Sequence, residues 1–177
     1  MHKKLVMTLA GHDRVGIVDD ITKIVFNHGA NVQSSRMARL ESEFAVLMLI
    51  SVPHTRYHDL QQELNRLRDE GYYISTMVAA GEDPQKYSGW LPYQVHVSGA
   101  DHEGIIHHIA HHLAQKGINI ETMDTSMMAA PMSGTALFMM HAIVYAPPDQ
   151  PYLKWKKDLQ QISETLNVNT EVTPYTG

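Results

Sequence analysis

The chain of 177 residues carries the same sequence pattern twice, and this repeat constrains the fold more than any other feature. The segment GHDRVGIV begins at residue 11, and the similar segment GADHEGII begins at residue 99, which is 88 residues later. The same shift carries Gly29 onto Gly117 and Asn31 onto Asn119. Matches that keep their order at a constant spacing indicate a duplicated unit.

Two insertions lengthen the second copy. The shift grows to 94 residues at Phe44, which matches Phe138, and to 99 residues at the tetrapeptide DLQQ, which occurs at 59–62 and again at 158–161. Length changes at two separate places, with matching segments between them, are expected when the insertions fall in loops of a duplicated unit. The sequence therefore predicts one domain over 1–80, a Gly- and Pro-containing linker at 81–90, and a second domain over 91–177.

The hydrophobic pattern predicts the order βαββαβ in each copy. Ile17, Ile21 and Val25 form the inner stripe of a first helix, and Leu60, Leu64 and Leu67 that of a second helix over about 55–70. Strands are predicted at 4–10, 32–40, 43–52 and 72–80. The second copy repeats the order with strands near 92–98, 119–128, 135–146 and 168–174, and helices at 103–116 and about 151–165.

This order predicts an α+β protein made of two ferredoxin-like βαββαβ domains, each an antiparallel sheet with both helices on one face. The strand over 44–52 is apolar at successive positions, so we expect it to be buried on both faces. Because a domain of about 80 residues is marginal on its own, the open sheet face is expected to pack on another copy, which predicts a homo-oligomer.

Composition excludes several classes of function. The 14 Lys and Arg residues are outnumbered by 19 Asp and Glu, giving a net charge of −5, so direct nucleic-acid binding is not expected. The absence of Cys removes disulfides, thiolate metal sites and thiol nucleophiles. Neither an export signal nor a membrane span is indicated, and we expect a soluble cytoplasmic protein. No phosphate-binding Gly-rich loop or Ser nucleophile motif occurs, so neither catalysis nor a cofactor is predicted.

The pattern D-x-x-G…G-x-N, present in both copies, is the candidate ligand site. A strand-to-helix turn presents free backbone N–H groups to a carboxylate, glycine permits close approach, and the Asp and Asn side chains suit an ammonium group. Together they predict a seat for a zwitterionic amino acid. The residues are Asp13, Gly16, Gly29 and Asn31 in the first copy, and Asp101, Gly104, Gly117 and Asn119 in the second.

A purely structural interpretation of these residues stays open. Asp13 and Asp101 would be helix N-caps, Gly29 and Gly117 would end helices, and the Asn residues would tolerate left-handed turns.

The segments LAGHDRVGIVDDI, HGANV and SRMARLESEFAVLMLISVP resemble the ACT domain, a small amino-acid-sensing regulatory module. The tandem arrangement resembles ACT proteins of the type that represses transcription of the glycine cleavage system. The resemblance implies a ferredoxin-like fold, amino-acid binding where two ACT domains meet, and a DNA-binding activator as the restrained partner. Val15 and Glu103 stand where many members have proline, and Glu103 places a negative charge beside the second seat.

A histidine cluster offers an alternative. His107 and His111 are four residues apart, as are His108 and His112, and such pairs on a helix can bind a metal, with His102 as a third ligand. The inner stripe of this helix predicts that His107, His108 and His111 face outward. Three hypotheses follow: an amino-acid sensor acting through a protein partner, a regulatory subunit of a metabolic enzyme, and a metal-dependent enzyme.

Methionine gathers in the second copy over residues 119–146. The Met residues inside its strands are expected in the core, with Met132 as a candidate for partner contact.

Overall fold

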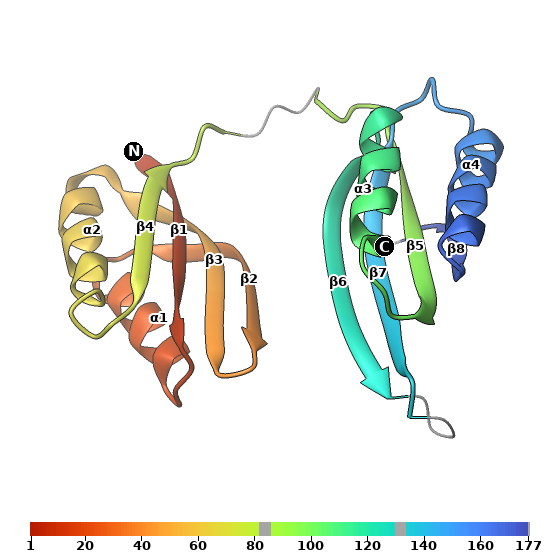
Figure 1. The fold of residues 1–177 in the computed structure, drawn as a ribbon. Coiled ribbons are helices and arrows are strands. Elements are labelled where there is room, and N and C mark those ends of the chain that lie inside the picture. Colours follow the sequence, from red (N-terminus) through yellow and green to blue (C-terminus); the bar gives the residue numbers. More distant parts are fainter. Residues whose placement is uncertain (82–85, 130–133, 177) are drawn as a thin grey trace. The chain divides into compact units, whose positions relative to one another are not determined.

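The computed structural model describes residues 1–81, 86–129 and 134–176, and divides into two compact units, Met1–Glu82 and Asp83–Gly177 (Figure 1). The first unit consists of β1 (His2–His12), α1 (Ile17–Asn27), β2 (Asn31–Leu40), β3 (Glu43–Pro53), the 3₁₀ turn η1 (His54–Arg56), α2 (Tyr57–Arg66) and β4 (Tyr73–Val78). The second unit consists of β5 (Leu91–Ala100), α3 (Ile105–Gln115), β6 (Asn119–Ala129), β7 (Ala136–Ala146), α4 (Tyr152–Thr165) and β8 (Val168–Pro174). The predicted linker at 81–90 falls partly outside the described residues, and its bounds stay a prediction.

Each unit is a four-stranded antiparallel sheet with both helices on one face (Figure 1). The strand order is β2-β3-β1-β4 in the first sheet and β6-β7-β5-β8 in the second. The predicted α+β class and the repeated βαββαβ order are therefore confirmed. No helix in the described part of the chain is long and apolar enough to cross a membrane.

The core of each unit lies between the sheet and its two helices. In the first unit, Leu5, Met7 and Leu9 alternate inward from the central strand β1 and are fully buried. The predicted helix stripes pack on them: Ile17, Ile21 and Val25 from α1, and Leu60, Leu64 and Leu67 from α2 and its C-terminal turn. Helical periodicity thus identified the buried faces correctly.

The prediction that residues 44–52 are buried on both faces was wrong. Val46, Met48 and Ile50 are buried, whereas Leu47 between them is 49% exposed. The helices cover only one face of the sheet, and the described residues of this unit leave the other face open. Its apolar side chains include Leu47, Met77 and Tyr73.

The predicted aspartate caps were also wrong. The N-cap positions of α1 and α3 are Gly16 and Gly104, with φ of 93° and 92°, and no side chain bonds to either helix start. This left-handed conformation favours glycine, so the backbone itself turns the chain into the helix. The predicted helix ends are confirmed, because Gly29 and Gly117 have φ of 62° and 68° directly after the C-caps.

The second insertion lengthens a helix. The segment DLQQ begins two residues after the start of α2 but six residues after the start of α4, so α4 gains about one turn at its N-terminus. This turn supplies Trp155, which is 1% exposed and packs edge-on against Tyr93. The first insertion lies in the β6–β7 connection, where residues 130–133, including Met132, fall outside the described residues.

The methionine prediction holds only in part. Met140 is buried and Met123 packs on the core, but Met127, Met128 and Met139 are 65%, 50% and 43% exposed. The exposed three lie on the open face or near the free end of the β6–β7 hairpin, where no helix covers the sheet.

Gly11 and Gly99 occupy equivalent positions near the ends of the central strands β1 and β5. The chain passes close to each glycine as it returns from the second helix of the unit. A Cβ at Gly99 would lie 2.8 Å from Val168 Cγ1 and 3.0 Å from Val168 Cα, while one at Gly11 would lie 2.6 Å from the Tyr72 ring. The same position is therefore restricted to glycine in both copies, by the residue just before β4 in the first unit and by the first residue of β8 in the second.

We expect Gly99→Ala to lower the free energy of unfolding by about 1–3 kcal/mol, because the backbone at Val168 must shift to admit the methyl group. Ser98→Ala, on the adjacent exposed position, is the control and should change stability by less than about 0.5 kcal/mol. Urea unfolding followed by circular dichroism measures both, and equal stability of the two variants would contradict the packing argument.

Candidate functional site

The eight predicted contact residues lie in two kinds of turn. Asp13 and Gly16 lie between β1 and α1, and Asp101 and Gly104 lie between β5 and α3. The other four are at the helix-to-strand turns: Gly29 and Asn31 between α1 and β2, and Gly117 and Asn119 between α3 and β6.

The two kinds of turn lie at opposite ends of each sheet. Asn31 pairs with Ser51 on β3, and Ser51 pairs with Lys4 near the start of β1, whereas Asp13 follows the end of β1. Nine residues of extended strand separate Lys4 from Asp13, which corresponds to about 30 Å. Within one unit the structure therefore places Asp13 near Gly16, and Gly29 near Asn31, without joining the two pairs.

The second unit repeats this separation. Asn119 pairs with Tyr145, which pairs with Pro92 at the start of β5, and Asp101 follows the end of that strand. Whether the eight residues contact a ligand stays a prediction, but no single unit presents all four of its residues at one place.

The β1–α1 loop leads into a helix start without a side-chain cap, and a backbone hydrogen bond fixes the position of Asp13 in this loop. The Asp13 N–H donates to the Ser42 carbonyl at 2.8 Å, and the equivalent Asp101 N–H donates to the Ala136 carbonyl at 3.0 Å. The Asp13 carboxylate lies 3.9 Å from Arg39 Nε. An uncapped helix N-terminus favours an anion, so the loop has the polarity that a ligand carboxylate requires.

Arg14, which the sequence interpretation missed, links this loop to the turn before β4. Its guanidinium Nη2 lies 2.7 Å from Asp20 and 3.0 Å from Glu70, in the turn before β4. The bond to Asp20 raises the pKa of Arg14 further above its ordinary value, so the guanidinium stays protonated at every physiological pH. Its place inside the repeated loop motif was the available clue.

His102 occupies the equivalent place in the second unit, 88 residues later. One ring nitrogen lies 2.6 Å from the Leu166 carbonyl in the turn before β8, and the other lies 3.0 Å from the Glu103 carbonyl. Since both neighbours are acceptors, only the doubly protonated ring donates to both. The Leu166 carbonyl, followed by that of Glu103, raises the pKa of His102 above 6.5.

The helix histidines divide between two environments. His107, His108 and His111 are exposed, as predicted, but His112 is only 6% exposed. Burial, followed by the charge of Lys116, lowers the pKa of His112 and favours its neutral form. The pair His108 and His112 therefore does not face one surface.

No metal centre is preformed among these residues. In the described ranges no three His, Asp or Glu side chains are placed around a common point. Both ring nitrogens of His102 already face carbonyl groups.

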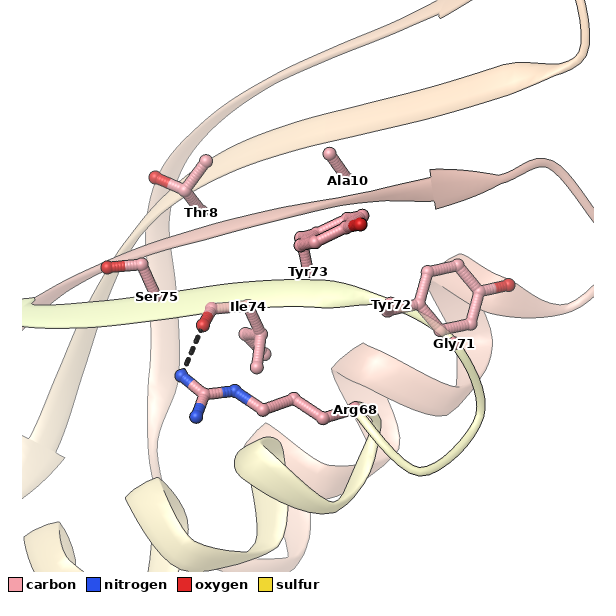
Figure 2. A pocket seen from close by; sticks show the side chains of 8 residues that line it. All are labelled: Thr8, Ala10, Arg68, Gly71, Tyr72, Tyr73, Ile74 and Ser75. Carbon is pink, nitrogen blue, oxygen red and sulfur yellow. Dashed lines mark hydrogen bonds between the residues drawn. The ribbon is translucent and has the colours of Figure 1, made fainter.

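Three depressions of the described surface are lined by residues other than the eight predicted ones. One of about 660 Å³ wraps the edge strand β4, where Arg68 donates to the Ile74 carbonyl at 2.7 Å while Tyr73, Ala10 and Thr8 lie on the other side of the sheet (Figure 2). A second, of about 270 Å³, lies on the open face between Ala38, Ala45 and Tyr73. A third, of about 450 Å³, lies on the open face of the second sheet.

The duplicated sheet-and-helix units with matched loops define a tandem ferredoxin-like α+β protein. The ACT domain family model matches residues 3–72. A solved structure of an unknown protein from Galdieria sulphuraria is 32% identical, with a TM-score of 0.83, and the match covers 99% of this chain and 100% of that one. The first unit therefore matches the ACT domain family, and the second unit repeats its fold.

Two further relatives are named for the glycine cleavage system. The "Glycine cleavage system transcriptional repressor" of Escherichia coli (strain K12) is 49% identical over 47 residues, which are 27% of this chain and 25% of that protein. The chain thus matches about a quarter of the length of this relative. A solved structure proposed to be a glycine cleavage system transcriptional repressor is 20% identical, with a TM-score of 0.70 over 100% of this chain and 99% of that one, and shows the shared fold.

We expect the His102 contacts to stabilise the second unit below about pH 6.5, and this contribution to vanish as the pH rises through the raised folded pKa. The sign follows because the folded state binds the proton more tightly than the unfolded state. NMR titration of the His102 ring should give a pKa above 6.5.

The variant His102→Gln should lower the thermal midpoint at pH 5.5 more than at pH 8.5. His107→Gln, at an exposed position on α3, is the control and should show a smaller difference between the two conditions. A folded pKa at or below 6.5 for His102 would contradict the assigned contacts.

Proposed function

We propose that this protein is a non-catalytic regulator that binds a small amino acid and acts through a protein partner to control transcription of glycine cleavage genes. The observation that carries the proposal is the tandem ACT architecture, together with 49% identity over 47 residues to a glycine cleavage system transcriptional repressor. The net charge of −5 fits an indirect role, because contact with DNA phosphates requires a basic surface.

The loops and turns offer separate binding groups for the carboxylate and the ammonium group of an amino acid. The uncapped starts of α1 and α3 suit a carboxylate, and the amides of Asn31 and Asn119 suit hydrogen bonding to either ligand group. Because the helix between these features is 11 residues long, about 16 Å, one small ligand contacts either the loop or the turn of a given unit. A binding site that uses both the loop and the turn requires more than one ACT domain, which agrees with what the family resemblance implies.

The proposed effector is glycine or another small amino acid, and we expect it to raise the thermal midpoint of the protein. A ligand at 100 times its Kd stabilises the folded state by about 2.7 kcal/mol, which shifts the midpoint of a domain of this size by several degrees. Thermal unfolding with each of the twenty amino acids at millimolar concentration measures the effect.

Asn31→Ala and Asn119→Ala should each reduce the ligand-induced shift of the midpoint if both turns bind the amino acid. If only one turn binds it, the variant that reduces the shift identifies that turn. Asn65→Ala, at a half-buried position near the end of α2, is the matched control. If none of the twenty amino acids moves the midpoint by more than the experimental error, the sensing proposal fails.

The open face of the first sheet supports self-association. Leu47, Met77 and Tyr73 are 49%, 59% and 83% exposed there, and apolar groups of this size gathered on one face favour burial against another protein. We propose a second copy of the chain as the occupant, as the repeat architecture predicts.

Light scattering coupled to size exclusion at micromolar concentration should give at least twice the 20.0 kDa chain mass. Leu47→Glu should shift the protein toward monomer, since a charge would be buried in the contact. Leu153→Glu, on the exposed side of α4, is the control and should leave the mass unchanged. A monomer of the unmodified chain would refute the association.

A further inference from the structure

The open face of the second sheet carries four ionisable side chains in a single row across all four strands. Asp124 on β6 pairs with His141 on β7, His141 pairs with His96 on β5, and His96 pairs with Glu171 on β8. Directly paired residues project from the same face, so the register alone places acid, imidazole, imidazole and acid side by side.

The first unit has no such row. Its equivalent positions, by the same register, are Arg36, Leu47, Thr8 and Ser75. The fold therefore does not require ionisable groups here, since the duplicate folds with an apolar and neutral centre.

The two imidazoles are in contact, and one is incompletely satisfied. The His96 and His141 rings stack with centroids 4.5 Å apart and planes 29° from parallel. His96 Nε2 contacts the Gln94 amide, whereas His141 Nε2 is buried without a hydrogen-bond partner. A buried nitrogen of this kind costs free energy until a proton donor, proton acceptor or metal ion reaches it.

The row lies in the depression of about 450 Å³, which leaves room for a ligand. Ser98, Ser126 and Asn169 add hydroxyl and amide groups to its lining. Two carboxylates beside two imidazoles favour a cation.

The donor set narrows the class of cation. Imidazole nitrogen combined with carboxylate oxygen is typical of Zn²⁺ and neighbouring divalent transition metals, while Mg²⁺ and Ca²⁺ prefer oxygen alone. Adjacent strands are about 4.8 Å apart, so imidazoles on neighbouring strands can reach one ion, and a flanking carboxylate can complete its coordination.

We propose that Asp124, His96, His141 and Glu171 form a binding site for a divalent transition-metal ion of the zinc class. In the described residues no three of these side chains yet surround one point, so binding requires both rings to turn out of their stack. His96 is exposed and His141 half-buried on an uncovered face, which makes this rotation possible without moving the strands. The site assembles when the ion arrives.

Isothermal titration of the untagged, chelator-treated chain with ZnCl₂ tests the proposal. We expect saturable binding, weakened at least tenfold in His96→Ala and in His141→Ala. Asp124→Asn and Glu171→Gln should weaken it less, because one carboxylate can replace the other. Circular dichroism of each variant without metal confirms that it folds.

The exposed helix pair His107 and His111 is the competing site, and the double variant His107→Ala/His111→Ala is the matched control. It should retain the binding that His96→Ala loses. Co²⁺ added to the unmodified chain should give visible absorption bands, and these should disappear in His141→Ala. Binding that is absent, or lost only in the helix variant, would overturn the proposal.

Discussion

The pairing of each central strand with two antiparallel neighbours determines where every loop of this protein lies. β1 and β5 are hydrogen-bonded on both sides, and their inward side chains are covered by two helices. Because each helix returns the chain to the opposite end of the sheet, the strand-to-helix loop and the helix-to-strand turn are kept apart by the length of an 11-residue helix, about 16 Å. The proposed ligand contacts therefore lie at opposite ends of each sheet and do not form a single pocket within one unit.

Much of the fold followed from periodicity in the sequence. Stripes such as Ile17, Ile21 and Val25 predict both the helix and its buried face, since only one face of a surface helix can reach the core. The helix caps were assigned to Asp13 and Asp101 instead of Gly16 and Gly104, because the glycines act through backbone conformation, whereas an aspartate cap is recognised by its side chain.

The candidate sites were less accessible to sequence reasoning. The D-x-x-G…G-x-N pattern suggested one cluster, but residue order does not reveal which end of a sheet a turn occupies. His96 and His141 are 45 residues apart and meet only through strand register. The conspicuous run of histidines on α3 drew attention instead, although one of its members, His112, belongs to the core.

Comparison of the two copies separates what the fold needs from what it leaves free. Gly11 and Gly99 are both confined by the returning chain, so the same steric constraint applies twice. Positions outside the core have diverged in charge: Arg14 corresponds to His102, and Leu47 to His141. A permanent ionic link in one unit is thus replaced by a proton-dependent link in the other, and an apolar sheet face by an ionisable one. Both copies keep the same strand order and the buried helix stripes, so each unit presents a surface with its own chemistry on a shared fold.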